Sequence, residues 1–375
     1  MSIQNQLADS RLDSRAIDGG TVATLLSCSP ADPAWDDFLD STPVGRFEQS
    51  CRWAQVKATE GFHPARLVLA PNHGFVGGCQ ILWRRSRLGA FGYMSKGPVL
   101  AQEDAEIADT LVEALCGVAR TLRLRALIVQ PPEFSNALTK ALIARRFLPN
   151  HIADLITATL VVDLAQGMEK IEKAMSRTTR QKVRQARDRG VVVREGGESD
   201  IGRFFQLMLS TCKRQSTEPN PSNEESLHRL WDAFHPSGSV RLSFAEYNSE
   251  PLSGLLSIAF GNRVTFWKRG WVSRDDNLHP NELLMYDALK WAQANGYKFA
   301  DFGSLEREIA MTLLQGKSLS EEQKRSRDFF HLGFGGEPQL LPEGLVYFPS
   351  PVLRHLYLKA FSKRFLANAV KRMLR

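Results

Sequence analysis

The sequence predicts an α+β fold that occurs twice along the chain, as a tandem duplication with mixed central sheets flanked by helices. The chain has 375 residues, of which 43% are apolar and 24% charged, and its predicted strands and helices follow an order that repeats. A domain usually takes ~100–200 residues, so this length favours two domains. The composition is typical of a globular protein and excludes a disordered chain, a collagen-like repeat and a coiled-coil rod.

The first half of the chain predicts one α+β unit. Segments rich in Val, Ile and Leu predict strands over residues 66–70, 74–83 and 90–95. A helix is expected over residues 105–122, because apolar residues recur there on one face at helical spacing. A further strand over 126–130 ends at two prolines. Antiparallel strands, a helix and one more strand form an α+β unit.

The second half repeats this order. Strands are expected over residues 239–247, 252–260 and 264–272, followed by a helix over 282–295 and a strand over 298–302. A proline just before the helix and a glycine just after it mark its ends. A repeat this long indicates duplicated domains rather than a solenoid.

We therefore place the first domain at residues 22–165 and the second at residues 166–350, followed by a basic helical tail over 351–375. The net charge is +7, from 48 basic and 41 acidic residues. The tail contains seven basic residues and no acidic residue, and a second basic block occupies residues 169–189. Concentrated basic charge is typical of proteins that bind phosphate, nucleic acid or an acidic membrane surface. A solvated helix face is the alternative for both blocks.

The end of the tail, residues 363–375, is basic and amphipathic, which predicts peripheral contact with an anionic membrane. The alternative is a helix that caps its own domain. No run of residues approaches the ~18 apolar residues that a spanning helix needs, and the start of the chain lacks the pattern of a signal peptide. Five scattered cysteines are typical of reduced thiols in a cytosol. We therefore expect a cytoplasmic protein, with peripheral membrane contact at the inner face.

Two short segments in the first half carry groups that suit an anionic substrate. Trp53 and Lys57 lie on neighbouring turns of a predicted helix. Tyr93 and Lys96 end a predicted strand beside a Gly-Pro turn, where they would project towards a phosphate or carboxylate. The alternatives are an amphipathic helix with a solvated lysine and an ordinary turn.

In their order along the chain, these and later segments resemble the FemABX family of non-ribosomal peptidyl (aminoacyl) transferases, in the GNAT superfamily. The resemblance covers roughly residues 45–340. It is carried by Gln49-Ser50, Trp53-Ala54 and Lys57, by Tyr93 and Lys96-Gly97-Pro98, by Arg177, Lys182-Val183-Arg184 and Gly190, by Pro280, Leu283-Leu284, Trp291-Ala292 and Asp301-Phe302-Gly303, and by Phe330 and Phe334-Gly335-Gly336. It implies two GNAT-like (acyl-CoA N-acyltransferase-like) domains, no metal and no tightly bound cofactor. It also implies transfer of an amino acid from aminoacyl-tRNA to an amine on a peptidoglycan precursor.

The resemblance also implies roles for individual residues. Lys57 falls where the family places a lysine that contacts the diphosphate of the precursor. With the two segments described above, the substrate-binding candidates are Trp53, Lys57, Tyr93, Lys96, Thr211, Lys213, Arg214, Trp267 and Arg269. The catalytic candidates are His331 and Asp301. His331 stands where the terminal motif of the family usually has a lysine, so a fixed cation is replaced by a group that titrates near neutral pH.

Three alternatives remain open. An acyl-CoA-dependent GNAT N-acyltransferase acting on an envelope or exopolysaccharide amine would differ only in its donor. The glycine-rich helix start that holds the pyrophosphate of CoA is not evident in the sequence. A catalytically degenerate protein that only binds envelope precursors is the second alternative, favoured by His331. A nucleic-acid regulator is the weakest, because a basic helix specifies no sequence; tRNA is the expected nucleic acid, and DNA is not.

Overall fold

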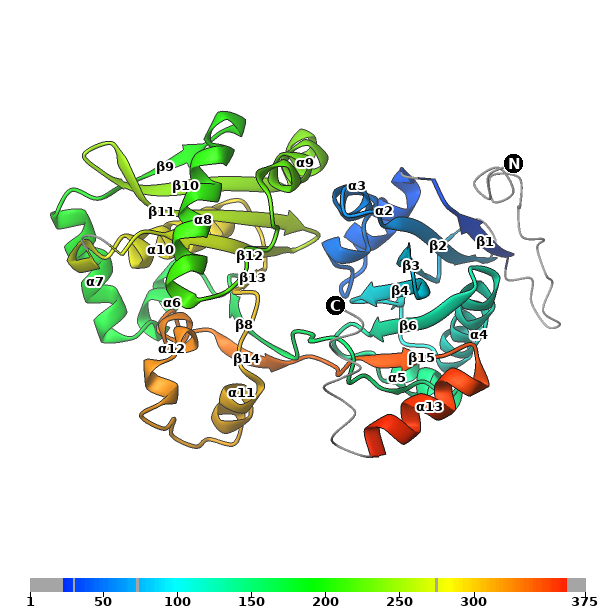
Figure 1. Cartoon of the computed structure of the whole chain (residues 1–375). Coiled ribbons are helices and arrows are strands. Elements are labelled where there is room, and N and C mark those ends of the chain that lie inside the picture. Colours follow the sequence, from blue (N-terminus) through cyan, green and yellow to red (C-terminus); the bar gives the residue numbers. More distant parts are fainter. Residues whose placement is uncertain (1–22, 30, 72–73, 274–275, 363–375) are drawn as a thin grey trace. The chain divides into compact units, whose positions relative to one another are not determined.

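The computed structural model describes residues 23–29, 31–71, 74–273 and 276–362 (Figure 1). The chain divides into two compact units. Unit 1 contains the described residues up to Leu155 together with those from Pro342 onward, and unit 2 is Ile156–Leu341. Each unit has a mixed β-sheet with helices packed on it, so the predicted duplicated α+β class is confirmed.

Unit 1 is built on one sheet whose strands run in the order β1, β2, β3, β4, β6, β15 and β7, with β5 paired to β3. Their bounds are β1 Ala23–Ser27, β2 His63–Ala70, β3 Gly77–Ser86, β4 Gly89–Ser95, β5 Val99–Leu100, β6 Leu124–Gln130, β7 Leu148–Pro149 and β15 Leu345–Tyr347. Only the β4–β6 pair is parallel among these described strands.

The sheet of unit 2 runs in the order β9, β10, β11, β12, β13, β8 and β14. The bounds are β8 Ala158–Asp163, β9 Val192–Gly196, β10 Val240–Tyr247, β11 Glu250–Phe260, β12 Arg263–Trp271, β13 Phe299–Asp301 and β14 Glu337–Leu340. Position by position, every pair has the same orientation as its counterpart in unit 1, including the single parallel pair, β12–β13. The two halves of the chain therefore share one topology.

Two strands join a different sheet from the one that the expected domain boundaries assign. β8 lies within the expected first domain of residues 22–165 but pairs with β13 and β14 in unit 2. β15 lies within the expected second domain of residues 166–350 but pairs with β6 and β7 in unit 1. The observed division therefore falls after Leu155 and again before Pro342. A short apolar strand can pair equally well in either sheet, so its sequence does not indicate which sheet it joins.

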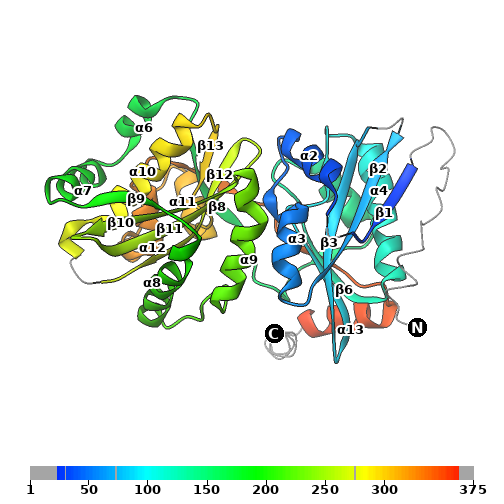
Figure 2. The same cartoon turned by 90° about the horizontal axis from the view of Figure 1, so that it is seen from above.

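Helices cover both faces of the sheet in unit 1. Helix α4 (Ala105–Thr121) packs on one face, and α2 (Pro33–Ser41) and α3 (Cys51–Ala58) lie on the other (Figure 2). Asp104 caps α4, and its apolar face buries Leu111 and Leu115 in the core. The remaining helices of the unit are α5 (Asn136–Ala144) and α13 (Pro351–Ser362).

The sheet of unit 2 is likewise covered on both faces. Helix α8 (Ile201–Gln215) crosses one face, while α10 (Pro280–Ala294) packs on the other (Figure 1). The other helices are α6 Met168–Ala174, α7 Arg177–Asp188, α9 Glu224–Phe234, α11 Arg307–Leu314 and α12 Arg327–Leu332. The predicted basic block over 169–189 forms α6 and α7. Two of its basic side chains make contacts within unit 2: Lys182 forms an ion pair with Glu282, and Arg187 lies over the ring of Tyr286.

No helix among the described residues is long and apolar enough to cross a bilayer. The first turns of the predicted tail form α13, which packs on unit 1 through Tyr357. Residues 363–375 lie outside the described part of the chain, so their contact with an anionic membrane stays a prediction.

Candidate functional site

The parallel strands of unit 2 part from each other after a short pairing. β12 and β13 pair over three residues only, from Arg263↔Phe299 to Thr265↔Asp301. After Asp301 the chain turns to β8, where Phe302 donates its backbone N–H to Leu160 at 2.9 Å. β12 continues to Trp271, and a bulge at Trp267 shifts its register against β11. Bulges of this kind often lie beside active sites, where they re-aim side chains.

Arg269 lies on the diverging half of β12. Its guanidinium carbon is 4.4 Å from the centroid of the Phe330 ring. Its Nη1 is buried and has no hydrogen-bond partner among the described residues. Burial lowers the pKa of Arg269 to about 10. The Glu282 carboxylate raises this pKa and the Arg327 guanidinium lowers it, both to a smaller extent than burial. The side chain is therefore a buried cation with unused donor capacity at neutral pH.

His331, on α12, meets the same cluster. The residue is 8% exposed, and its Nδ1 is buried without a hydrogen-bond partner in the described structure. Its ring lies 5.4 Å from that of Phe302 and 5.6 Å from that of Phe330. Burial, and then the positive charges of Arg269 and Arg327, hold the pKa of His331 well below its usual value. The imidazole is therefore neutral at pH 7, with one donor and one acceptor nitrogen.

The charge balance of this cluster comes from residues that the sequence did not single out. Glu282, in the first turn of α10, is 7% exposed and accepts from Lys182 Nζ at 3.0 Å. Arg327 Nη2 pairs with Asp328 at 3.1 Å. An acid in the first turn of a helix is ordinary, and an Arg-Asp neighbour pair is common on surfaces. No local signal could therefore have identified Glu282 or Arg327.

Asp301, the second catalytic candidate, is committed to its neighbours. Arg263 Nη1 donates to Oδ2 at 2.8 Å, and the backbone N–H of Gly303 donates to Oδ1 at 2.9 Å. Thr159 also donates to this carboxylate. These contacts fix the end of β13, and they give no support to a role for Asp301 in proton transfer. Within the described residues, no group of three His, Cys, Asp or Glu side chains is placed to hold a metal ion.

The candidates at the end of α8 form a second cluster in unit 2. Thr211 Oγ1 accepts from the backbone N–H of Trp271 at 2.9 Å, which ties α8 to the end of β12. The guanidinium carbon of Arg214 lies 3.9 Å from the centroid of the Trp271 ring. Lys213 is exposed and Trp267 is half-buried. Thr211 and Arg214 thus position Trp271 in addition to any substrate role.

In unit 1 the structure brings together three of the predicted residues. Lys57 Nζ donates to Glu60 Oε1 at 2.6 Å and lies 5.2 Å from the ring of Trp53. Trp53 also hydrogen-bonds the side chain of Tyr93, whose pKa is raised mainly by burial and further by Glu60. Lys96 follows β4 with a φ of 55°, and its ammonium group is buried.

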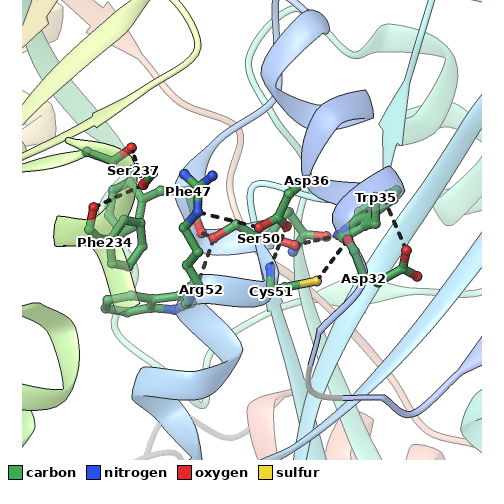
Figure 3. Close-up of polar contacts among 12 residues, drawn as sticks. Asp32, Trp35, Asp36, Phe47, Ser50, Cys51, Arg52, Phe234 and Ser237 are labelled. Carbon is green, nitrogen blue, oxygen red and sulfur yellow. Dashed lines mark hydrogen bonds and ion pairs between the residues drawn. The ribbon is translucent and has the colours of Figure 1, made fainter. Parts of the chain in front are cut away.

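The helix that carries Trp53 and Lys57 is anchored at its start (Figure 3). Ser50 Oγ caps α3 by accepting from the backbone N–H of Trp53 at 3.1 Å. Asp36 accepts from the backbone N–H of Cys51 at 2.6 Å. Burial raises the pKa of the Cys51 thiol to about 12, so this cysteine is not a nucleophile. The anchor fixes where Lys57 emerges from α3.

Gln49 ties this anchor to the sheet. Its Nε2 donates to Ser95 O at 2.8 Å, and its Oε1 accepts from Gln80 N at 2.8 Å. A Cβ on Gly97 would lie 2.6 Å from the Gln49 amide, so only glycine fits there. The strand end that carries Tyr93 is therefore held against the start of α3.

Comparisons with known proteins agree with this arrangement. Residues 173–308 match the model of an acetyltransferase (GNAT) domain, and residues 31–143 match that of the FemAB family. The chain is 25% identical over 292 residues to the UDP-N-acetylmuramoylpentapeptide-lysine N(6)-alanyltransferase of Weissella viridescens, covering 73% of this chain and 84% of the relative. It is 23% identical over 233 residues to the lipid II:glycine glycyltransferase of Staphylococcus saprophyticus, covering 59% of this chain and 56% of the relative.

The chain thus spans about half the length of that glycyltransferase. Among solved structures, a crystal structure of FemX is similar, with a TM-score of 0.75 at 16% identity. The match covers 90% of this chain and 99% of that one. This likeness concerns the fold.

Proposed function

We propose that this chain, which belongs to the FemAB family of GNAT-type transferases as the sequence predicted, transfers an aminoacyl group to an amine on a cell-envelope precursor. A peptidoglycan precursor is the acceptor that the named relatives favour. The observation that carries the proposal is the buried Arg269 guanidinium beside the neutral His331, at the point where β12 and β13 part. An unused buried cation suits a site where negative charge develops during a reaction.

The chemistry is the conversion of an ester to an amide. The acceptor amine attacks the ester carbonyl carbon, the C–N bond forms, the C–O bond breaks, and the amine proton passes to the leaving oxygen. The carbonyl oxygen becomes an oxyanion on the way, and Arg269 stabilises it through Nη1. His331 is too weakly basic to carry the proton, so its imidazole orients the reacting groups by a hydrogen bond.

The starts of the helices that follow the third strand in each repeat support aminoacyl-tRNA over acyl-CoA as donor. A helix start binds a diphosphate through free backbone N–H groups. In unit 2, α10 begins with Pro280, which has no N–H, and buries the carboxylate of Glu282 in its first turn. In unit 1, the Asp104 carboxylate occupies the N–H groups of Glu106 and Ile107 at the start of α4, at 2.8 and 2.9 Å. Acids at both positions oppose a CoA diphosphate.

The Lys57 cluster in unit 1 is the proposed contact for the diphosphate of the precursor. Lys57 is paired with Glu60 at a partly exposed site, and such ion pairs contribute about 0–1 kcal/mol. A diphosphate carries more charge than one carboxylate and replaces Glu60 at little cost. Trp53 and Tyr93 shape the apolar side of this contact. Because aminoacyl-tRNA is a cytoplasmic donor, we infer that the protein acts in the cytoplasm.

The test is a transfer assay with the purified full-length protein and UDP-N-acetylmuramoyl-pentapeptide as acceptor. One reaction contains tRNA charged with labelled amino acids, and the other contains labelled acetyl-CoA. We expect an acceptor mass increased by one amino acid with the charged tRNA only. Label transferred from acetyl-CoA alone would replace the proposed donor. Acceptor binding without transfer from either donor would identify a degenerate binding protein and overturn the proposal.

A further inference from the structure

A large apolar pocket in unit 1 lies outside the residues that the proposed reaction uses. Its volume is about 1180 Å³, above the ~300–1,000 Å³ of most small-molecule sites. The pocket lies on the sheet face opposite α4. Its floor is formed by Phe91, Ala126 and Ile128, and one wall by Leu353, Leu356 and Tyr357 of α13.

The wall formed by α13 is fixed in place. Tyr357 is 7% exposed, and its hydroxyl donates to Pro149 O at 2.6 Å while accepting from His151 N at 2.9 Å. Its ring also lies 4.8 Å from that of Phe348. These contacts fix the position of the wall that α13 forms. Leu356, in contrast, is 55% exposed although it lines an apolar cavity.

The charged residues that line the pocket are all exposed, so they define its mouth, and most of them are basic. Four are basic, Arg84, Arg87, Arg125 and Lys359, and one, Asp154, is acidic. Arg87 and Arg125 have no acidic partner among the described residues. An apolar interior with a basic mouth matches an amphiphile that has an apolar chain and an anionic head.

The basic mouth is continuous with the Lys57 cluster. The Arg84 guanidinium carbon lies 4.7 Å from the centroid of the Phe62 ring, and that ring packs edge-on against Tyr93 at 5.1 Å. Tyr93 in turn contacts Trp53, over which Lys57 lies. One ligand with its chain in the pocket would therefore present its head towards these cations.

We propose that this pocket binds the apolar chain of a lipid diphosphate. Charge selects this occupant over two others. The segment 363–375 of this chain has five basic residues and no acidic residue, so the basic mouth repels it. A second copy of the chain also carries a net charge of +7. The proposal deepens the proposed function, on which its biological meaning rests, because it adds the lipid-linked form of the acceptor as a substrate.

Binding is tested by titration calorimetry on the full-length protein with farnesyl diphosphate, a short lipid diphosphate. Farnesol, which lacks the head, and inorganic pyrophosphate, which lacks the chain, are the comparison probes. We expect farnesyl diphosphate to bind at least tenfold more tightly than either. Equal binding of pyrophosphate would show a surface phosphate contact only, and equal binding of farnesol would show that the basic mouth plays no part; either result overturns the proposal.

Matched variants on α13 locate the site. Leu356→Glu places a carboxylate in the pocket, whereas Val352→Glu places one on the same helix at a residue that is 67% exposed and does not line the pocket. We expect at least tenfold weaker farnesyl diphosphate binding for Leu356→Glu and for Arg87→Glu, and a change within twofold for Val352→Glu. Thermal unfolding checks that each variant is folded. Wild-type affinity in both Leu356→Glu and Arg87→Glu would overturn the assignment.

Two further outcomes separate the inference from its alternatives. Leu366→Glu combined with Val370→Glu, both in the segment 363–375, should leave farnesyl diphosphate affinity within twofold. A tenfold gain would mean that this segment occupies the pocket, which would overturn the proposal. If the wild-type protein transfers amino acids to the nucleotide-linked acceptor but does not bind farnesyl diphosphate, this inference is wrong and the proposed function stands. If it binds farnesyl diphosphate but transfers no amino acid, the proposed function is wrong and the pocket assignment stands.

Discussion

The two parallel strand pairs, β4–β6 in unit 1 and β12–β13 in unit 2, occupy the same position in their sheets but differ in length. β4 and β6 stay paired up to their last residues, Ser95↔Gln130. β12 and β13 pair over three residues and then part. The topology is therefore the same in both units, while the length of the parallel pairing differs.

The residues at the ends of these two strand pairs also differ. In unit 1 Gln130 is 2% exposed, and its backbone oxygen accepts from Gly97 N at 3.1 Å, which closes the end of the pair. In unit 2 the longer strand, β12, carries Arg269, which lies over the ring of Phe330 next to His331. The pair β12–β13, the opened pair of unit 2, therefore lies beside a buried arginine, whereas a backbone hydrogen bond closes the end of β4–β6 in unit 1.

The largest effect is expected at the opened pair. Arg269→Met keeps an apolar side chain over Phe330 but removes the charge, and it should lower kcat/KM for transfer by about 10²–10³-fold. Stability should change little, because the substitution removes a buried Nη1 that has no hydrogen-bond partner among the described residues. Lys268→Met, at the next residue, is the control and should keep the wild-type rate. Transfer at the normal rate in Arg269→Met would exclude the opened pair as the reaction site.

Two glycines compare the packing of the two strand ends. A Cβ at Gly270 would lie 2.4 Å from Met208 N in the backbone of α8, and one at Gly97 would lie 2.6 Å from the Gln49 side chain. Gly270→Ala should destabilise by about 3 kcal/mol and Gly97→Ala by about 2 kcal/mol, because a side chain moves more readily than a helix backbone.

Urea unfolding measures both variants. Gly117→Ala is the control, because nothing lies within 4 Å of its Cβ position in α4, and it should stabilise by about 0.5–1 kcal/mol. A smaller loss for Gly270→Ala than for Gly97→Ala would show that the end of β12 is the looser of the two.

Lys57→Ala tests the binding side of the comparison. It should weaken binding of UDP-N-acetylmuramoyl-pentapeptide about tenfold or more, since a hydrogen bond to a charged group is worth about 1.5–3 kcal/mol, and it should leave kcat at saturation unchanged. Calorimetry and steady-state kinetics measure the two quantities. Glu60→Gln, which removes the partner of Lys57, should bind slightly more tightly. Unchanged affinity in Lys57→Ala would remove Lys57 from the site.

The smallest effect is a pH dependence of stability that belongs to unit 2. The pKa of His331 is held below its usual value in the folded protein. Above pH ~6.5 the imidazole is therefore neutral in both the folded and the unfolded state, and it causes no pH dependence of the free energy of unfolding there. As the pH falls below this value, the unfolded state binds a proton that the folded state does not. His331 should therefore lower the free energy of unfolding by up to ~1.4 kcal/mol per pH unit.

Urea unfolding between pH 7 and 5 tests this, with His331→Gln as the comparison. The variant should lose stability less steeply than the wild type over this range. Identical slopes would mean that the imidazole is protonated in the folded protein, and that it does not act as a neutral group beside Arg269.

Strongly periodic elements were predictable from the sequence. The helices expected over 105–122 and 282–295 are found at Ala105–Thr121 and Pro280–Ala294. Their apolar spacing and their capping residues are local properties. β15, with three residues, has too few positions to show a period, and its pairing with β6 depends on the folded sheet. The domain boundaries were less predictable for this reason.

The residues of the candidate site could be named from the sequence one at a time, but not as a cluster. Arg269 and His331 were both candidates, yet only the fold of unit 2 brings β12 and α12 together. Their mutual effect on the pKa of His331 depends on burial, which the sequence does not contain. Asp301 was a candidate as part of the segment Asp301-Phe302-Gly303 that carries the resemblance, but Arg263 and Gly303 donate hydrogen bonds to its carboxylate.

The exchange of β8 and β15 between the sheets has a consequence for biosynthesis. While the ribosome is still translating unit 2, β6 in the emerging first half has an edge without its neighbour, because β15 is synthesised only after unit 2. Exposed edges of this kind promote aggregation. A transcript truncated before the codon for Leu345 would therefore yield a polypeptide whose amino-terminal half is unfinished, even though most of its residues had already been made.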